Sequence, residues 1–122
     1  MDIGTDIIEI DRIDHLLRKY PNFRSRFFTE REIAYCERKK YPAQHYAARF
    51  AAKESILKAL GNELSEIIRF RDLEIINNRS GKPEVSLHNQ AYIFSQKRGI
   101  KTIKISLSHC KAYAIAVTQI IT

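Results

Sequence analysis

Glycine, proline and cysteine are scarce in this sequence of 122 residues, which has four glycines, three prolines and two cysteines. That scarcity excludes a collagen-like chain. Because 44% of the residues are apolar and 29% are charged, the composition also differs from that of a disordered chain. A chain of this length buries roughly 65% of its unfolded surface, so one core forms without disulfides or a structural metal. We therefore expect a single globular domain over residues 1–122.

Long hydrophobic runs are missing as well. The longest uninterrupted apolar stretch covers the six residues 112–117, and the N-terminus has an early Asp2 where a secretory signal would carry basic residues. These features predict neither a membrane span nor a signal peptide. Cys36 and Cys110 lie far apart and belong to no C-x-x-C pair or zinc-type His/Cys cluster. A reducing compartment, the cytoplasm, is the simpler interpretation.

Positive charge, in contrast, is plentiful. Lysine and arginine total 21 against 14 aspartate and glutamate residues, which gives a net charge of +7 and a pI near 9.6. Such a chain favours an anionic partner. Charge alone leaves three classes of partner open: nucleic acid, a phosphorylated small molecule and an acidic protein.

The hydropathy pattern predicts an α+β fold with one N-terminal strand, a helical segment and a mostly antiparallel sheet that includes one more helix. Strands are expected at 2–10, 72–77, 83–87, 101–109 and 113–121. The strands at 72–77 and 83–87 form a hairpin, because the NRSGK segment between them provides a turn in which Gly81 adopts positive φ.

Start and stop signals mark the helices. The first helix follows the N-terminal strand and ends at Pro21. Its apolar stripe comprises Ile13, Leu16, Leu17 and Tyr20. Thr29 and Glu32 form a capping box that opens a second helix. A third helix covers 43–60 and ends at Gly61, and a fourth lies at 89–99.

Asp6 occupies an apolar position in the first strand. Strand alternation places it on the same face as Gly4, Ile8 and Ile10. Burying an unpaired carboxylate is prohibitive, so Asp6 is expected to lie near the sheet edge, to pair with a cation or to hold a metal.

The third helix also turns charges toward its apolar side. Its apolar stripe comprises Tyr46, Phe50, Leu57 and Leu60. Lys53 falls inside that stripe, and Glu54 lies only about 40° from Phe50 on the helical wheel. One interpretation is a surface pair between Glu54 and Lys58, with Lys53 extending its ammonium to water. In the second interpretation, Glu54 is surrounded by the positive charges of Arg49, Lys53 and Lys58. This arrangement is suited to binding phosphate and a divalent cation.

His109 ends the strand at 101–109, whose other residues on the same face are apolar. Those residues are Ile103, Ile105 and Leu107. A histidine with an ordinary pKa near 6.5 serves there either as a structural residue or as a functional one.

Four segments together resemble holo-acyl-carrier-protein synthase, the short single-domain class of 4′-phosphopantetheinyl transferases. They are GTDIIEIDRI at 4–13, RFAAKESILKAL at 49–60, GKP at 81–83 and SLSH at 106–109, and their order and spacing span nearly the whole chain. The resemblance implies that family's fold and a magnesium-dependent transfer of 4′-phosphopantetheine from coenzyme A to a serine of apo-acyl carrier protein, which serves fatty acid and lipid biosynthesis. It also implies a homotrimer with coenzyme A between subunits; the strand at 113–121 is our candidate interface.

The resemblance also implies roles for single residues. Asp6 and Glu54 match the metal-binding acids, with Mg²⁺ as the cofactor. Lys58 matches a lysine near the phosphates, and Arg49 and His109 match residues that line the coenzyme A pocket. Glu54 and Lys58 are the catalytic candidates, because Glu54 could accept the serine proton, directly or through a metal-bound water, while Lys58 stabilises charge on the phosphate oxygens.

A basic segment, residues 12–28, is the expected docking face for the carrier protein. It contains Arg12, Arg18, Lys19, Arg24 and Arg26 against a single acid, Asp14. Acyl carrier proteins are acidic as a family, and Arg12 and Arg26 stand at positions similar to carrier-contacting arginines. The alternative is an ordinary solvated helix face.

The sequence departs from the family pattern in three places. NELSEIIRF replaces the usual glycine-rich loop after Gly61, Cys110 stands where a small polar residue or an aspartate is more familiar, and Ser55 replaces an alanine. Serine is only modestly worse than alanine in a helix, so Ser55 is expected to be tolerated.

Two other functions compete with this interpretation. A basic nucleic-acid-binding protein would stack bases on aromatic residues of the basic segment. Those aromatic residues are Tyr20, Phe23, Phe27 and Phe28. That function leaves Asp6 and Glu54 unexplained, so we expect no nucleic-acid partner. A trimeric scaffold without activity is the other alternative, and the intact acids and lysine argue against it.

Overall fold

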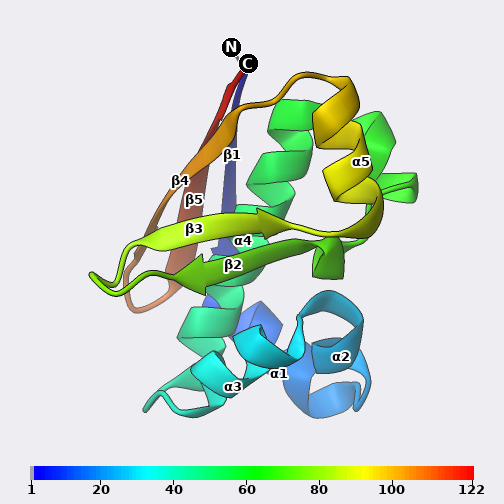
Figure 1. Ribbon diagram of the computed structural model, residues 1–122. Coiled ribbons are helices and arrows are strands. Elements are labelled where there is room, and N and C mark those ends of the chain that lie inside the picture. Colours follow the sequence, from blue (N-terminus) through cyan, green and yellow to red (C-terminus); the bar gives the residue numbers. More distant parts are fainter. Residues whose placement is uncertain (1) are drawn as a thin grey trace.

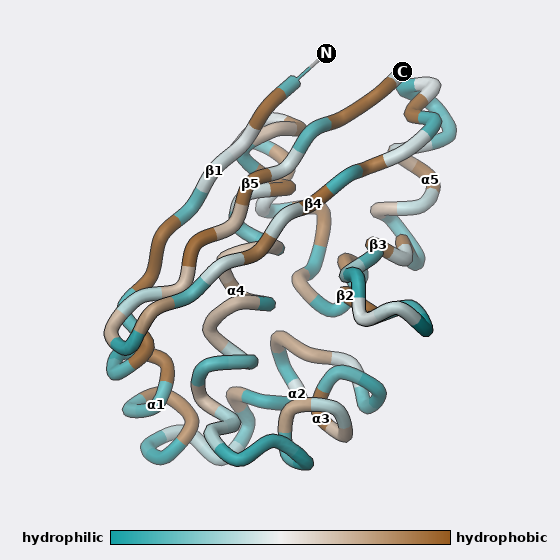
Figure 2. The backbone as a smooth tube through the Cα atoms, turned by 90° about the vertical axis from the view of Figure 1, so that its left-hand side faces the viewer, coloured by the Kyte–Doolittle hydropathy of each residue, from teal (hydrophilic) through white to brown (hydrophobic). Residues whose placement is uncertain are grey.

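The computed structural model describes residues 2–122, which form two antiparallel sheets around a long helix (Figure 1). The larger sheet has the strand order β1–β5–β4, with bounds Asp2–Glu9, Tyr113–Ile121 and Thr102–His109. The smaller sheet is the hairpin of β2, Leu73–Asn77, and β3, Pro83–Leu87. The long helix α4, Pro42–Leu60, packs against β1 and β5, so the larger sheet covers one side of it (Figure 2).

The other helices lie toward the two ends of α4. Three of them, α1 (Ile10–Lys19), α2 (Phe23–Phe27) and α3 (Glu30–Glu37), gather at the end opposite the chain termini (Figure 1). The helix α5, Asn89–Lys97, lies toward the termini. Two 3₁₀ turns, η1 (Asn62–Glu66) and η2 (Phe70–Asp72), connect α4 to β2. Within residues 2–122, no helix combines the length and apolar character needed to cross a membrane.

The predicted α+β class, the strands and the capping box at Thr29 are confirmed, with four differences. The strands expected in one sheet divide into two, because β3 and β4 contact each other without pairing. Ile10 begins α1 instead of ending β1. The short helix α2 was not predicted. Tyr20 is 48% exposed and lies outside the apolar stripe, because the residue before Pro21 is extended and ends α1.

β1 lies in direct contact with the backbone of α4 at Gly4. A Cβ atom at this position would stand 2.0 Å from the carbonyl oxygen of Ser55 and 2.8 Å from the backbone nitrogen of Ala59. Only glycine permits this approach. Asp6 follows two residues later on the same strand face, so the contact at Gly4 brings that carboxylate to α4.

Ser55 has a specific partner in the larger sheet. Its Oγ lies 2.6 Å from Oγ1 of Thr118 on β5 and donates to the carbonyl oxygen of Ala52 at 2.8 Å. Ser55 and Thr118 are both fully buried. The two hydroxyl groups therefore satisfy each other's hydrogen bonds where α4 meets β5.

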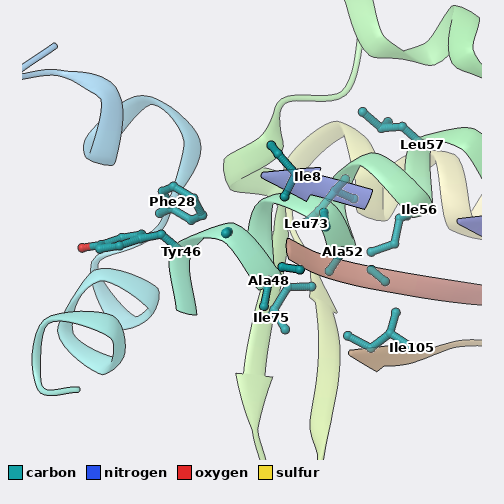
Figure 3. Packing of buried hydrophobic residues seen from close by; sticks show 14 of the residues in the cluster. Ile8, Phe28, Tyr46, Ala48, Ala52, Ile56, Leu57, Leu73, Ile75 and Ile105 are labelled. Carbon is teal, nitrogen blue, oxygen red and sulfur yellow. The ribbon is translucent and has the colours of Figure 1, made fainter. Parts of the chain in front are cut away.

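The main apolar core surrounds α4, which is buried on most sides. Figure 3 shows Ile8 of β1 and Ile105 of β4 near the middle of this helix, and Phe28 facing Tyr46 near its start. The rings of Phe28 and Tyr46 are 5.0 Å apart. Phe27 and Phe23 pack on further core rings, so three of the four aromatic residues considered for base stacking belong to the core.

Lys53 lies at the centre of a buried polar network. Its side chain is completely buried, and Nζ donates to Oε1 of Glu32 and to the carbonyl oxygen of Phe27, both at 2.7 Å. A third hydrogen bond runs to the carbonyl oxygen of Phe70 at 3.0 Å. All three donors of the ammonium are therefore used. Both sequence-based interpretations of Lys53, a chain extending to water and a phosphate contact, are wrong.

Glu32 completes this network from α3. The Oε1 atom also accepts the backbone N–H of Thr29 at 2.9 Å in the capping box, and Oε2 accepts the backbone N–H of Ile75 at 3.0 Å. One buried carboxylate thus joins the start of α3, the middle of α4 and strand β2.

We predict that Lys53→Met lowers the free energy of unfolding by about 3–5 kcal/mol, because it leaves Glu32 as an unpaired buried carboxylate. Adding Glu32→Gln removes that charge and should recover part of the loss. Urea unfolding at pH 7 measures both variants. A double variant that is no more stable than Lys53→Met would contradict the explanation based on charge.

Candidate active site

Asp6 and Lys58 meet where β1 crosses α4. Nζ of Lys58 donates to Oδ1 of Asp6 at 2.9 Å. The side chain of Asp6 is 15% exposed and that of Lys58 is 44% exposed, so the pair borders solvent. Of the three environments expected for Asp6 from the sequence, the structure shows pairing with a cation.

Glu54 stands one helical turn before Lys58 and is half-buried. Burial raises the pKa of its carboxyl group, and the negative charge of Asp6 raises it further. The positive charges of Lys58 and Arg12 act in the opposite direction. Asp6, Glu54, Lys58 and Arg12 therefore form one electrostatic group, which we call the acid site.

The acid site fits a divalent cation. The negative charge of Asp6 raises the pKa of Glu54, so a positive charge placed between the two carboxylates would offset that repulsion, and Mg²⁺ commonly takes one or two protein carboxylates. The ammonium of Lys58 already neutralises part of this charge beside Asp6. Among residues 2–122, no group of three or more His, Cys, Asp or Glu side chains could hold a metal ion.

Arg49 belongs to a second group, on another side of α4. Its guanidinium lies 4.0 Å from the ring centre of Tyr35, and one terminal nitrogen donates to Oδ1 of Asn77 at 2.5 Å. The residue is only 3% exposed, and its Nε has no hydrogen-bond partner within the described part of the chain. Arg49 stands five residues before Glu54, which is about 140° away around α4, and its contacts are with Tyr35 and Asn77, so it belongs to a different side of the helix from the Glu54 carboxyl.

His109 joins the Arg49 group through His45. The rings of His109 and His45 are 6.4 Å apart, and the His45 ring is 5.8 Å from that of Tyr35. Burial lowers the pKa of His45, and the charges of Arg49, Lys39 and His109 lower it further. The sequence analysis missed Tyr35 and His45, although His45 lies one helical turn before Arg49 and therefore shares its side of α4.

A basic cleft opens beside Arg49. Its volume is about 560 Å³, and residues of α3 and of the β2–β3 hairpin line it. The positively charged residues among them are Arg31, Arg38, Lys39, Arg49 and Arg79, and none of the lining residues is acidic. The cleft is therefore suited to a ligand that carries several phosphates.

The two arginines predicted to contact a partner protein, Arg12 and Arg26, are both exposed. Arg26 lies 5.5 Å from the ring centre of Phe27. Arg24, from the same basic segment, instead pairs with Glu37 at 2.9 Å and donates to the carbonyl oxygen of Leu17. Arg18 pairs with Asp14 at 2.7 Å. Arg12, Arg26 and Lys19 therefore remain the more available cations of this segment.

Comparison with known proteins identifies the family. Residues 2–118 match the family model of the 4′-phosphopantetheinyl transferase superfamily. The holo-acyl-carrier-protein synthase of Moorella thermoacetica is 42% identical over 120 residues, which cover 98% of this chain and 93% of the relative. That of Ruminiclostridium cellulolyticum is 46% identical over 118 residues, with 95% and 88% covered.

Solved structures agree in fold. The holo-acyl-carrier-protein synthase of Neisseria meningitidis superposes with a TM-score of 0.91 at 30% identity, and the match covers 99% of this chain and 98% of that one. The Helicobacter pylori synthase in complex with coenzyme A gives a TM-score of 0.84 at 30% identity, with 98% and 99% covered. The likeness therefore extends over whole chains.

The raised pKa of Glu54 predicts a change in stability with pH. A carboxyl group whose pKa is raised by folding contributes its full stability below the unfolded value near 4.5, and that stability is lost as the pH rises through the folded pKa. Glu54→Gln should therefore raise Tm at pH 7 to 8, and the gain should shrink toward pH 4. Thermal unfolding across this range measures it.

The matched control for this prediction is Glu66→Gln, which neutralises an exposed carboxylate on η1. It should change Tm little at any of these pH values. If the rise in Tm for Glu54→Gln is no larger than that for Glu66→Gln, burial and the charge of Asp6 do not destabilise the ionised form of Glu54.

Proposed function

Because the chain belongs to the 4′-phosphopantetheinyl transferase superfamily, and within it to the holo-acyl-carrier-protein synthases, we propose that it modifies an apo-acyl carrier protein. It transfers 4′-phosphopantetheine from coenzyme A to a serine hydroxyl and releases adenosine 3′,5′-bisphosphate. The observation that carries this proposal is the acid site, in which Asp6 and Glu54 adjoin a lysine and an arginine. Its product, the holo-carrier, serves fatty acid biosynthesis.

Glu54 is the proposed general base. The serine oxygen forms a bond to the phosphorus that carries pantetheine, the bond from that phosphorus to the bridging oxygen breaks, and the bisphosphate leaves with this oxygen. The serine proton goes to Glu54. Its raised pKa makes the carboxylate a stronger proton acceptor than an ordinary glutamate, because basicity follows pKa.

Lys58 is the proposed phosphate contact. Its ammonium has three donors, and the structure uses one on Asp6, so others can reach phosphate oxygens from the exposed side. Phosphoryl transfer depends mainly on positioning and charge neutralisation. A positive charge held in place by Asp6 would therefore stabilise the oxygens as their charge develops.

Asp6 and Glu54 would hold Mg²⁺, the proposed cofactor, with substrate oxygens and waters completing its coordination. When bound, the ion neutralises pyrophosphate charge. The protein's own part is to fix the two carboxylates, through the close contact of β1 and α4 at Gly4 and through the Lys58 ion pair.

Arg49 and His109 are proposed to line the coenzyme A pocket. The unpaired Nε of Arg49 provides a donor, and the acid-free basic cleft beside it would receive the phosphates of the nucleotide. The stack of Arg49 on Tyr35 fixes the guanidinium before any ligand arrives.

We predict that Asp6→Ala and Glu54→Ala each nearly abolish transfer and leave the fold intact. The assay incubates the protein with coenzyme A, Mg²⁺ and apo-acyl carrier protein and detects phosphopantetheine addition by intact mass. A variant that keeps most of its kcat at saturating Mg²⁺ would remove that residue from the metal site. No addition by the unsubstituted protein would exclude the proposed function, in favour of the inactive scaffold.

The outer face of the larger sheet supports a homotrimer. Ile3 and Ile7 of β1 are 69% and 62% exposed, and Ile115 and Val117 of β5 are 39% and 43% exposed. Apolar side chains in such number on one sheet face are typical of an interface. A chain of this size also has little room to enclose coenzyme A alone. An active monomer in sedimentation equilibrium at assay concentrations would exclude the trimer and its shared pockets.

We place the protein in the cytoplasm with its carrier.

Arg12 and Arg26 are the proposed contacts to the acidic carrier protein. We predict that Arg12→Glu and Arg26→Glu raise KM for the carrier and change KM for coenzyme A little, because exposed charges act mainly on association. Salt should weaken the unsubstituted protein more than either variant. Steady-state kinetics at low and moderate ionic strength measure this. Equal carrier KM values for all three proteins at low salt would place docking elsewhere.

A further inference from the structure

Two exposed arginines, Arg69 and Arg71, lie beside and within η2, at the end of the NELSEIIRF segment and directly after it. Both line an open cleft of about 590 Å³ that Arg26 of α2 also lines. Both also line a second cleft, of about 540 Å³. Arg69 and Arg71 therefore form a ridge between two clefts, which we call the arginine ridge.

The charge of the arginine ridge is largely uncompensated. The side chain of Arg69 has no hydrogen-bond or ion-pair partner among residues 2–122, and Arg71 donates one side-chain N–H to the carbonyl oxygen of Ser25 at 2.9 Å. Glu66 is the one acid that lines the first cleft. Asp72, in the second cleft, is buried and accepts from the side chain of Asn89. Three arginines thus face the first cleft against one carboxylate.

The arginine ridge connects to the acid site through aromatic side chains. Phe27 and Phe70 line the same cleft, with ring centres 5.4 Å apart. Both rings pack on Phe50, at 5.7 and 5.1 Å. Phe50 lies one turn before Glu54 on α4, so its side chain and that of Glu54 share one side of the helix. A partner seated on the arginine ridge would therefore contact aromatic rings that pack on the Glu54 side of α4.

We propose that Arg69 and Arg71 form a second docking surface for the acidic carrier protein, in the cleft that Arg26 also lines. This inference rests on the proposed function. A carrier held by arginines of two separate segments, α2 and η2, is fixed at more than one point, which would orient its serine. The basic cleft at Arg49 shares none of its lining residues with this one, so the arginine ridge is separate from the proposed nucleotide site.

Arg69→Glu tests the proposal directly, because Arg69 makes no internal bond that the substitution would break. We expect KM for the carrier to rise about tenfold at low salt, with kcat and KM for coenzyme A within about twofold. Arg69→Lys keeps the charge and should behave nearly as the unsubstituted protein. Arg71→Glu should also raise carrier KM, and its Tm reports any effect of losing the bond to Ser25.

The matched control is Lys97→Glu, which makes the same change in net charge at an exposed position in the last turn of α5. It should leave every constant unchanged. A carrier KM for Arg69→Glu equal to that of Lys97→Glu would overturn the proposal while transfer by the unsubstituted protein still supports the function. A rise in KM for coenzyme A instead would assign the arginine ridge to the nucleotide and likewise overturn it.

Discussion

The buried ammonium of Lys53 is the interaction on which the arrangement of the site depends. Its Nζ donates hydrogen bonds to oxygen atoms at the end of α2, near the start of α3 and in η2. The counter-ion Glu32 also accepts a hydrogen bond from a backbone N–H of β2. A buried charge of this kind is tolerated only when all of its donors are satisfied together. The end of α2, the start of α3 and the η2 segment with the arginine ridge are therefore held by one nitrogen atom of α4.

Three cations of α4 have three different surroundings. Arg49 faces an aromatic ring and the basic cleft, Lys53 faces the interior, and Lys58 faces Asp6 and solvent. A helix buried on most sides separates these surroundings within little more than two turns. That separation places the basic cleft and the acid site along a single helix, with the buried ion pair of Lys53 and Glu32 between them.

Local signals predicted much of the fold. The capping box at Thr29, the alternation of the strands and the positive φ of Gly81 each depend on neighbours a few residues away, and all are present. Contacts distant in sequence could not be predicted. Lys53 was placed at the surface because Glu32 is 21 residues away in the sequence. Tyr35, which α3 brings to Arg49, was missed for the same reason. His45 and the separation of Arg49 from Lys58 were open to a local argument, because His45 lies one turn before Arg49 and nine residues turn an α-helix by about 180°. The family motifs, in contrast, gave the residues of the candidate site directly.

The hydroxyl pair of Ser55 and Thr118 has a consequence for how this sequence can vary. An alanine at position 55 alone would leave the Thr118 hydroxyl without this partner in a fully buried place. An apolar residue at position 118 alone costs less, because the Ser55 hydroxyl keeps its bond to the carbonyl oxygen of Ala52. The order of substitution therefore matters: position 118 can become apolar before position 55 changes, whereas the reverse order passes through a buried hydroxyl that has lost its partner.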